Sequence, residues 1–439
     1  MKTAAEALKQ EILEKVRQYW EVAHQPKPFV PFESRVNYSG RVYGAEEMTN
    51  LVDASLDFWL TLGPWGDQFE SKLRQYLGCR QVAIVNSGST ANLNAVMALM
   101  SPAFDNPLRP GDEVITPAVT FPTTLAPIVH GGLIPVFVDC EVGTYNVNPA
   151  LLEDAISPKT RAIMVPHTLG NPVDLDVITE LCARRNLYLI EDTCDALGGT
   201  WRGKQVGTFG DLGTLSFFPA HQLTTGEGGA VVINNPKLIK IVKAVRDWGR
   251  DCWCPTGESN TCGKRFDWQL GDLPAGYDHK YIYSMLGYNF KPTEMQAAIG
   301  CAQMDRLPSF VERRRANFRL FYDALAKYEG RIVLPTIDPR ANPSWFGFPI
   351  TVCEGISRVA LIKWLEDANI ETRLVFGGNI LKQPGYRDIP RRVHGSLEQS
   401  DRIMRDTFFL GVFPGMTEEK IAFITARLAA FLDDHAHAT

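Results

Sequence analysis

The sequence has neither a hydrophobic run long enough to span a bilayer nor a block of basic residues. No stretch of about 18 or more apolar residues occurs, so no transmembrane helix is expected. The net charge is −5, which does not favour nucleic acid or an anionic membrane as a partner. The N-terminal residues carry charges throughout, including Lys9, Glu11 and Arg17, unlike a signal peptide. We therefore expect a cytoplasmic protein that works away from membranes.

A regular set of cysteines for disulfide bonds is also missing. The nine cysteines are odd in number and unevenly spaced, and a reducing compartment would keep them as thiols. Three of them, Cys252, Cys254 and Cys262, lie within residues 251–265, a loop-like segment with proline and glycine. Thiolates at such density indicate a metal site. Five others are expected to pack as small hydrophobic side chains: Cys79, Cys140, Cys182, Cys301 and Cys353.

The N-terminal and central parts of the chain alternate short apolar strands with helices. This alternation predicts a parallel α/β sheet. An amphipathic helix over residues 1–24, followed by several prolines, indicates an N-terminal arm. Strands of the sheet are expected at residues 81–85, 113–117, 134–139, 162–165 and 187–190.

The pattern changes near Met304, where a long charged helix leads into mixed strands and helices typical of an α+β unit. Strands are expected there at residues 345–352 and 372–376, and helices at residues 359–368 and 418–433. We therefore expect three parts along the 439 residues. They are an N-terminal arm over residues 1–35, a large α/β domain over residues 36–305 that carries segment 251–265, and a small C-terminal α+β domain over residues 306–439.

Two strand ends carry residues suited to ligand binding. Residues 86–92, N-S-G-S-T-A-N, stand between a strand and an apolar helix, an order that can present backbone N–H groups to a phosphate. The strand at residues 187–190 ends in E-D-T-C-D-A, which contains Asp192. Ligands of open α/β sheets bind at such carboxyl ends. Each signal is common by itself, and together they indicate one site at this edge of the sheet.

One segment, residues 215–229, carries the most specific signal. It reads L-S-F-F-P-A-H-Q-L-T-T-G-E-G-G. It resembles the cofactor-lysine segment of the sugar aminotransferases, a branch of the fold-type I pyridoxal-phosphate enzymes, which reads roughly S-F-x-x-x-K-x-[IL]-T-T-G-E-G-G. His221 stands where these enzymes have the lysine. A lysine amine is needed to hold the cofactor aldehyde as a Schiff base. An imidazole cannot do this, but it can move protons near neutral pH.

The resemblance extends from about Gly44 to the C-terminus and implies an aspartate-aminotransferase-like fold, with a large α/β domain on a mixed, largely parallel sheet and a small α+β domain. It implies that Asp192 keeps the pyridine nitrogen protonated and that Phe121 stacks on the ring. The family has Gln or His where this chain has Asp195, so a contact to the ring hydroxyl stays open. The implied cofactor-binding residues are Gly88, Ser89, Thr90, Phe121, Asp192, Asp195, Ser216, His221 and Asn289.

A later segment that matches the family supplies Asn289. Residues 287–300 read G-Y-N-F-K-P-T-E-M-Q-A-A-I-G. In the family, the asparagine of this segment reaches the cofactor phosphate of the neighbouring subunit. The loop at Gly88, Ser89 and Thr90, together with Ser216, is implied to bind the phosphate within its own subunit. The resemblance therefore implies a homodimer.

The exchange of lysine for histidine is similar to that in the iron–sulfur 3-dehydrases of this family, which remove the C3 hydroxyl of nucleotide sugars. Cys194, Cys252, Cys254 and Cys262 form the pattern C-x57-C-x-C-x7-C, which in those enzymes binds a [2Fe–2S] cluster. Asp192 and Cys194 are two residues apart, roughly 7 Å along a strand, so a cluster on Cys194 would lie near the cofactor ring. A structural zinc site with four cysteine ligands is the alternative.

By this resemblance the chain is expected to be a dehydrase that uses pyridoxamine 5′-phosphate and a [2Fe–2S] cluster. Its substrate would be a nucleotide-linked 4-keto-6-deoxyhexose, with CDP-4-dehydro-6-deoxy-D-glucose favoured, on the route to the 3,6-dideoxyhexoses of lipopolysaccharide O-antigens. His221 would remove a proton from the 4′ carbon of the cofactor, and Asp192 would sustain the ring as an electron sink. A separate NADH-dependent iron–sulfur flavoprotein reductase would deliver electrons singly.

Two other functions stay open. A dTDP-linked 4-keto-deoxyhexose could be the substrate, with a ferredoxin- or flavodoxin-type electron donor. Alternatively, a catalytically inactive aminotransferase relative could act as a binding or structural subunit with a four-cysteine metal site. The spacing of the cysteines and the titratable His221 argue against the inactive relative.

Overall fold

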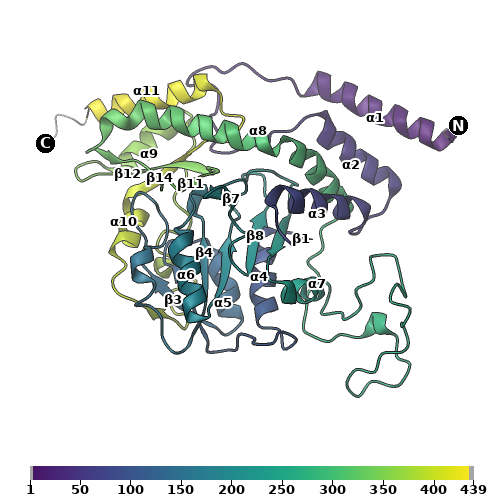
Figure 1. Ribbon diagram of the computed structural model, residues 1–439. Coiled ribbons are helices and arrows are strands. Elements are labelled where there is room, and N and C mark those ends of the chain that lie inside the picture. Colours follow the sequence, from purple (N-terminus) through teal and green to yellow (C-terminus); the bar gives the residue numbers. More distant parts are fainter. Residues whose placement is uncertain (1–2, 435–439) are drawn as a thin grey trace.

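The computed structural model describes residues 3–434 and is built on an eight-stranded sheet with helices packed against it (Figure 1). The strand order is β1-β9-β8-β5-β4-β2-β3-β13. Strands β8, β5, β4, β2 and β3 run parallel, whereas β9 is antiparallel to both of its neighbours. The strands of this sheet are β1 (Gln81–Val85), β2 (Glu113–Pro117), β3 (Ile134–Val138), β4 (Thr160–Pro166), β5 (Tyr188–Asp192), β8 (Leu212–Ser216), β9 (Gly229–Ile233) and β13 (Arg392–Val393).

The strand β4 shows why the predicted strands read as nearly continuous apolar runs. Ala162 and Met164 face a core cluster that includes side chains of α4 and α7, whereas Ile163 and Val165 face a cluster that includes α6. Both faces of the parallel sheet are therefore buried, which is the usual state of such sheets. All five strands that were expected in the large sheet form, each within two residues of its predicted limits.

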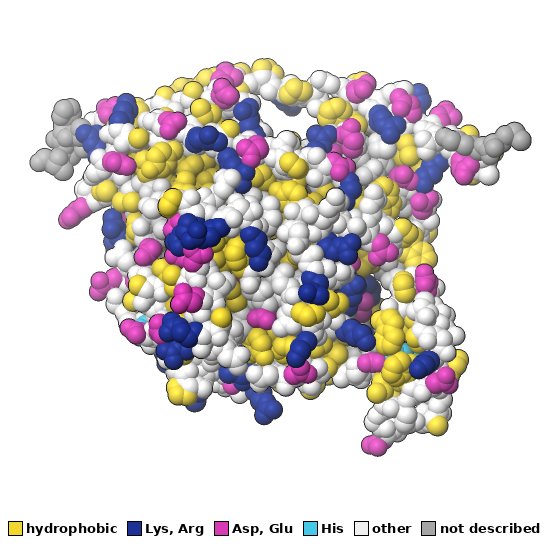
Figure 2. All heavy atoms as spheres, in the orientation of Figure 1, with side chains coloured by type: hydrophobic (Ala, Val, Ile, Leu, Met, Phe, Trp, Pro, Cys, Tyr) yellow, Lys and Arg dark blue, Asp and Glu magenta, His cyan; other side chains and the backbone are white. Residues whose placement is uncertain are grey.

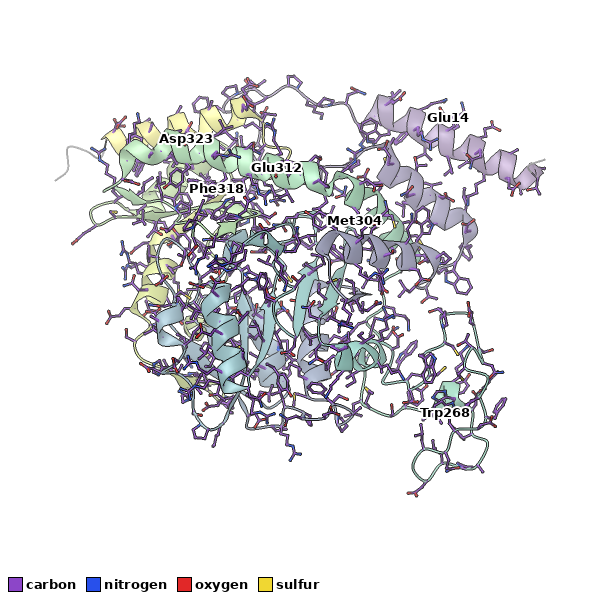
Figure 3. The ribbon with its side chains drawn as sticks, in the orientation of Figure 1. Glu14, Trp268, Met304, Glu312, Phe318 and Asp323 are labelled. Carbon is purple, nitrogen blue, oxygen red and sulfur yellow. The ribbon has the colours of Figure 1, made fainter. Side chains whose placement is uncertain are left out.

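The long helix α8 spans two cores. Met304 of α8 packs in a core beside the large sheet, while Phe318 packs in the core of the C-terminal part (Figure 3). The helices are α1 (Ala4–Ala23), α2 (Ala45–Asp57), α3 (Pro64–Leu77), α4 (Gly88–Leu99), α5 (Pro122–His130), α6 (Leu175–Arg185), α7 (Ile239–Arg246), α8 (Glu294–Leu325), α9 (Arg358–Glu366), α10 (Glu398–Asp406) and α11 (Glu418–Asp434).

The C-terminal part has its own apolar core beneath a second sheet in the order β10-β12-β14. A small third sheet has the order β11-β6-β7. These strands are β6 (Thr200–Trp201), β7 (Lys204–Gln205), β10 (Ile332–Val333), β11 (Ala341–Asn342), β12 (Gly347–Val352) and β14 (Thr407–Gly411). The mixture of strands and helices agrees with the expected α+β pattern, while the three domain limits drawn from the sequence stay predictions.

One expected strand, at residues 372–376, is wrong. The segment makes a single antiparallel bridge, from Arg373 to Phe409, and then leaves the sheet. Phe376 has a φ of 49° and Gly378 a φ of 60°, so the backbone turns where a strand would continue. The turn directs the following residues toward the carboxyl ends of the large sheet, where Gly377 and Tyr386 line a pocket.

Residues 247–293, between α7 and α8, project from the body of the molecule (Figure 1, lower right). The projecting segment contains one short 3-10 helix, η4 (His279–Tyr281). Apolar side chains show on its surface in Figure 2, and Trp268 lies within it in Figure 3. Its three cysteines are therefore held outside the large α/β core. Within residues 3–434, none of the helices has the length and apolar character that a bilayer crossing requires.

Candidate active site

The main cavity, about 590 Å³ in volume, lies at the carboxyl ends of the large sheet. The end of β5, the end of β8 and the first turns of α4 and α5 meet there, because the parallel strands end at the same edge of the sheet. Residues 373–386 close another side. Of the sequence-predicted site residues, the lining contains Gly88, Ser89, Phe121, Asp192, Cys194, Asp195, Ser216 and His221.

The first turn of α4 is shaped to receive an anion. Ser87 caps this helix by accepting a hydrogen bond from the Thr90 backbone N–H at 3.1 Å. A Cβ at Gly88 would lie 2.4 Å from Cβ of Ser216, so only glycine lets the two chains approach this closely. Free N–H groups at a helix start attract negative charge. Thr90 is absent from the pocket lining, and its hydroxyl donates to Oδ1 of Asn86 at 2.7 Å.

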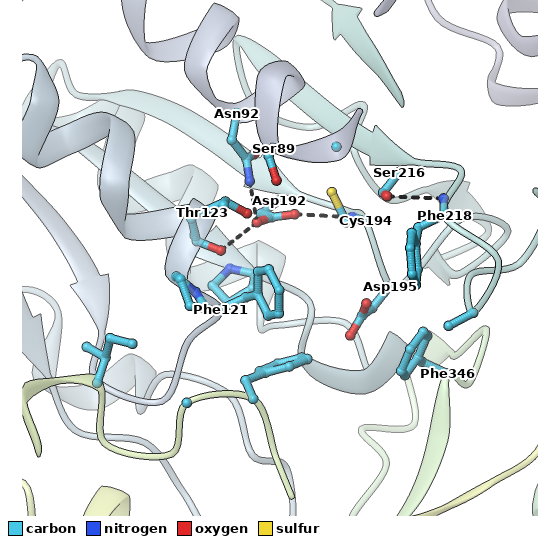
Figure 4. Close-up of a pocket in the computed structure, with 18 of the residues that line it drawn as sticks. Ser89, Asn92, Phe121, Thr123, Asp192, Cys194, Asp195, Ser216, Phe218 and Phe346 are labelled. Carbon is cyan, nitrogen blue, oxygen red and sulfur yellow. Dashed lines mark hydrogen bonds between the residues drawn. The ribbon is translucent and has the colours of Figure 1, made fainter. Parts of the chain in front are cut away.

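Asp192, at the end of β5, has a fixed and buried carboxylate (Figure 4). Its Oδ2 accepts hydrogen bonds from Nδ2 of Asn92 at 2.9 Å and from Oγ1 of Thr124 at 2.6 Å. Its Oδ1 accepts from the backbone N–H of Cys194 at 3.2 Å. The amide of Asn92 is itself oriented, because its Oδ1 accepts from Thr214 at 2.6 Å. Such a carboxylate can hold a cationic ring nitrogen in one position.

Asn92 and Thr124 are functional candidates that the sequence interpretation did not identify. Both occur within the quoted segments, N-S-G-S-T-A-N and T-F-P-T-T, but their roles depend on contacts between distant elements. Asn92 lies 100 residues and Thr124 lies 68 residues from Asp192 in the chain. Only the parallel order of the strands brings these helix starts to the end of β5.

The side chains of His221 and Asp195 lie next to each other in the pocket lining. Nε2 of His221 lies 3.3 Å from Oδ1 of Asp195. Nδ1 of His221 and Oδ2 of Asp195 are both buried and have no hydrogen-bond partner within residues 3–434. Burial raises the pKa of the Asp195 carboxyl above its ordinary value, although His221 acts in the opposite direction. The pair can therefore share or exchange a proton at the floor of the cavity.

The backbone around His221 is held by buried polar contacts. Arg314 donates to the His221 carbonyl at 2.8 Å and is fully buried, which lowers the pKa of its guanidinium to about 10. Gln222 donates to the carbonyls of Asp195 and Ser344. The segment that carries the imidazole is thus tied to the segment that carries the facing carboxylate. The imidazole has little freedom to leave the pocket.

An aromatic side chain with an open face forms another wall of the cavity. Phe121, at the start of α5, is 49% exposed although it lines the pocket, and its edge contacts Phe376 at a centroid distance of 6.1 Å. Figure 4 shows Phe121 below Asp192. A flat ligand ring could stack on this face.

The four cysteines of the sequence pattern occupy two separate places. Cys194 lines the main pocket, and burial raises the pKa of its thiol well above the ordinary value. Cys252, Cys254 and Cys262 line a second, small cavity in the projecting segment, and Cys194 does not line it. Across residues 3–434, no three His, Cys, Asp or Glu side chains stand as an assembled metal site. The structure thus groups three of the four thiols and separates the fourth.

In the second cavity the pKa values of two thiols, Cys252 and Cys254, shift in opposite directions. Burial acts against ionisation of Cys254, but a hydrogen bond from the Thr261 hydroxyl and the charge of Lys280 outweigh it, so the pKa of Cys254 falls below its ordinary value. Burial and the neighbouring Cys254 raise the pKa of Cys252. Of these two thiols, Cys254 therefore ionises more readily than Cys252.

Asn289 lies outside the pocket of its own chain. It is exposed, and its backbone makes an isolated bridge to Asp247 at the base of the projecting segment. It is not among the residues that line the main cavity. Its expected contact with a cofactor phosphate would therefore have to be made in another subunit.

Comparisons with known proteins identify relatives over most of the length of the chain. Residues 42–429 match the model of the DegT/DnrJ/EryC1/StrS aminotransferase family. The lipopolysaccharide biosynthesis protein RfbH of Salmonella typhimurium is 50% identical over 430 residues, which cover 97% of this chain and 98% of that protein. The dTDP-4-dehydro-2,6-dideoxy-D-glucose 3-dehydratase of Saccharopolyspora spinosa is 46% identical over 427 residues, which cover 97% of this chain and 92% of that protein.

A solved structure extends the likeness to three dimensions. The E. coli GDP-4-keto-6-deoxy-D-mannose-3-dehydratase with bound hydrated PLP superposes with a TM-score of 0.82 at 29% sequence identity. The match covers 90% of this chain and 100% of that one. The expected fold-type I architecture is thereby confirmed, as is the resemblance to the sugar aminotransferase family.

Proposed function

This chain belongs to the DegT/DnrJ/EryC1/StrS aminotransferase family, and from that membership we propose that it is a 3-dehydratase of nucleotide-linked 4-keto-deoxyhexoses. The observation that carries the proposal is His221, which occupies the lysine position of the family segment and faces Asp195 at 3.3 Å inside the main cavity. Relatives named as 3-dehydratases, at 46% and 36% identity, support the same reaction.

The residues of the main cavity fit pyridoxamine 5′-phosphate. The close approach at Gly88 leaves the first N–H groups of α4 open to a phosphate, beside Ser216. Asp192 offers a fixed carboxylate to a protonated ring nitrogen, and Phe121 offers a stacking face. When bound, this cofactor supplies an electron sink for cleavage of bonds beside its 4′ carbon. We propose that these residues, with Asn289 of a second copy, hold it in a homodimer.

His221 is proposed to move protons at the 4′ carbon of the cofactor. No lysine lines the main cavity within the described part of the chain, so no amine is placed to hold the cofactor covalently. Asp195 lies close enough to stabilise the imidazole when it gains a proton. Asp192 sustains the charge on the ring nitrogen. The chain thus has a proton-transferring histidine at the position where its family usually has a lysine that binds the cofactor covalently.

Removal of the sugar hydroxyl also needs electrons from outside the chain. Replacing the C3 hydroxyl by hydrogen takes up two electrons and two protons and releases one water. We propose that Cys252, Cys254 and Cys262, with Cys194 as the fourth ligand of the sequence pattern, would hold a [2Fe–2S] cluster, which would supply single-electron transfer from an NADH-dependent iron–sulfur flavoprotein reductase. The sequence pattern gives Cys194 as the fourth ligand, but within one chain it lines the cofactor pocket, so the loop cavity has three thiols.

The substrate is proposed to be CDP-4-dehydro-6-deoxy-D-glucose, the sugar nucleotide favoured by the resemblance to the iron–sulfur 3-dehydrases. A dTDP-linked sugar is the second candidate, because the relative at 46% identity is named for one. The CDP-linked and dTDP-linked sugars differ in the nucleobase and in their hydroxyl groups. Direct competition between them as substrates therefore distinguishes the two candidates.

The test is anaerobic incubation of the purified holoprotein with CDP- and dTDP-linked 4-keto-6-deoxy sugars, with and without a chemical reductant. Mass spectrometry of the products should show loss of one oxygen atom from the sugar only when electrons are supplied. A product that carries an amine at C4 would instead make the chain an aminotransferase. No change in any sugar, and no exchange of the 4′ proton with solvent, would favour an inactive relative.

A further inference from the structure

His221 lines a further small cavity in addition to the main one. This rear cavity lies between the segment that follows β8, the helix α8 and residues 40–42. Of the residues that the structure describes, His221 alone lines both cavities. The volume of the rear cavity is about 10 Å³. One water molecule needs roughly 10–15 Å³ by this measure, so the rear cavity is at the lower limit for a single water.

Three residues of the rear cavity each have a buried polar atom without a hydrogen-bond partner within residues 3–434. The three atoms are Nδ1 of His221, Oε1 of Gln222 and Nε of Arg314. Buried polar atoms without a partner are uncommon in folded proteins, and ordered water commonly satisfies those that the chain leaves. Because the three residues line the same cavity, one bound molecule can serve all three atoms.

The other hydrogen bonds of Gln222 and Arg314 fix what their free atoms can do. Nε2 of Gln222 donates to the carbonyls of Asp195 and Ser344, which uses both amide hydrogens and leaves Oε1 as an acceptor. The terminal nitrogens of Arg314 donate to the carbonyls of residues 220, 221, 345 and 346. Its Nε–H remains and can only donate. The rear cavity thus has one fixed donor and one fixed acceptor.

A water molecule matches this pair, whereas a simple ion does not. The oxygen of a water can accept from Nε–H of Arg314 while one of its hydrogens bonds to Oε1 of Gln222. A cation would be repelled by the guanidinium, and an anion would be repelled by the amide oxygen. A water bound in this way keeps one lone pair and one hydrogen. It can therefore pair with Nδ1 of His221 both before and after the ring gains a proton.

The pairing of Nδ1 decides which nitrogen of His221 can act as a base. Nε2 lies 3.3 Å from Oδ1 of Asp195, in the lining of the main cavity. For Nε2 to take a proton from carbon, the proton of the neutral ring must be on Nδ1. Asp195 favours the opposite form, because a carboxylate accepts from Nε2–H. An acceptor beside Nδ1 is needed to make the active form available.

From these contacts we propose that the rear cavity binds one water molecule, held by Arg314 and Gln222, which accepts a hydrogen bond from Nδ1 of His221. The lone pair of Nε2 is then left for the main cavity. Gln222 and Arg314 are thus positioning residues for proton transfer. The charged groups around the imidazole are Asp195 on the main-cavity side, and Arg314 and Arg41 in the lining of the rear cavity. The proposal rests on the role of His221 in the proposed function.

The first test is a crystal structure of the wild-type protein with pyridoxamine phosphate, at a resolution of about 1.5 Å or better. We expect one electron-density peak at roughly 2.7–3.2 Å from Nδ1 of His221, Oε1 of Gln222 and Nε of Arg314. The absence of a peak, with the three atoms in these places, would overturn the proposal. So would an anomalous signal at the peak, because it would identify an ion.

The second test compares two substitutions of Gln222. Gln222→Met removes the acceptor for the water, so exchange of the 4′ proton should fall about 3- to 10-fold, the effect of about one hydrogen bond. Cofactor affinity should stay nearly unchanged, because Asp192 and the first turn of α4 are untouched. Gln222→Glu also loses the amide hydrogens, but it keeps an oxygen that can accept from the water. Its exchange should exceed that of Gln222→Met.

Equal exchange in Gln222→Met and Gln222→Glu would assign the effect to the contacts with the carbonyls of Asp195 and Ser344, and would overturn the role of the water. Gln10→Met, at an exposed glutamine of α1, is the control and should leave exchange unchanged. Far-ultraviolet circular dichroism and pyridoxamine phosphate binding establish that each variant is folded.

The third test reads the position of the ring proton directly and needs no reaction. In protein labelled with ¹⁵N at histidine, the neutral ring of His221 should carry its proton on Nδ1, and the spectrum of His221→Asn identifies its signals. In Gln222→Met the population should shift toward the form with the proton on Nε2. A wild-type ring with its proton on Nε2 would overturn the proposal. If the wild type shows no 4′ exchange but has the peak and the ring form expected, the proposed function fails and the water site stands.

Discussion

Nε2 of His221 and Oδ1 of Asp195 lie 3.3 Å apart at the floor of the main cavity. The relatives that hold their cofactor covalently need a lysine at the first of these positions, and this chain has an imidazole beside a carboxylate there. A carboxylate near an imidazole favours its protonated form. The pair can therefore take a proton from carbon and keep it within the pocket.

Replacing His221 by Asn should separate proton transfer from cofactor binding. The amide has no basic nitrogen, so exchange of the 4′ proton of bound pyridoxamine phosphate should fall at least about 10²-fold. Cofactor affinity should stay nearly unchanged, because Asp192 and the α4 turn are untouched. The exchange is measured with labelled cofactor, saturating sugar nucleotide and no reductase. His130→Asn is the control at an exposed site. Unchanged exchange in His221→Asn would mean that another group is the base.

Replacing His221 by Lys should restore covalent retention of pyridoxal phosphate. The surrounding segment already matches the lysine-bearing relatives, and an amine there can condense with the aldehyde. The variant should absorb visible light after gel filtration with the cofactor and should lose dehydration of the sugar. Borohydride reduction followed by peptide mapping locates the bond. A folded variant that retains no cofactor would show that residue 221 does not face the cofactor aldehyde.

The hydroxyl of Thr124 should control cofactor affinity through Asp192. It donates to Oδ2 at 2.6 Å, and Thr124→Val removes this bond while keeping the shape of the side chain. A hydrogen bond to a charged group contributes roughly 1.5–3 kcal/mol, so the dissociation constant for pyridoxamine phosphate should rise at least about tenfold. Thr124→Ser keeps the hydroxyl and is the matched control. Equal affinities of the Val and Ser variants would show that Asn92 alone is sufficient to orient the carboxylate.

The sequence was sufficient for the parts of the site that lie on local motifs. Gly88, Asp192, Ser216 and His221 each follow or end a recognisable strand, and all four line one cavity. The partners of Asp192 could not be predicted, because hydrogen bonds between helices far apart in the chain depend on the strand order. Sequence spacing also gave no distance between Cys194 and the loop cysteines. Two cysteines separated by 57 residues can line the same cavity or different cavities. Here Cys194 lines the main cavity, whereas Cys252 lines the small cavity of the projecting segment.

Glu113, at the start of β2, should link the stability of the sheet edge to pH. Its carboxylate binds Arg392 of β13 through two hydrogen bonds of 2.9 and 2.8 Å, and it also accepts from Ser157 and Thr160. Arg392 is the main cause that lowers the pKa of Glu113 to about 2 from an ordinary value of 4.5. The contact joins β13 to the body, directly after residues that line the main cavity.

Because the pKa of Glu113 is lower in the folded state, the ionised carboxylate stabilises the fold above pH 4.5, and this stabilisation is lost as the pH falls toward about 2. Glu113→Gln should therefore lower the free energy of unfolding at pH 7 by roughly 1.5–3 kcal/mol, the range for hydrogen bonds to a charged group. The difference from wild type should shrink between pH 4.5 and pH 3. Urea unfolding at pH 7, 5 and 3.5 measures this difference in the free energy of unfolding.

Glu153→Gln, at an exposed carboxylate bound by Arg184 and Arg185, is the control. It should have little effect at any of these pH values, because solvent screens the ion pairs of Glu153. A difference for Glu113→Gln that stays constant down to pH 3.5 would mean that the lost contact is one of shape and not of charge.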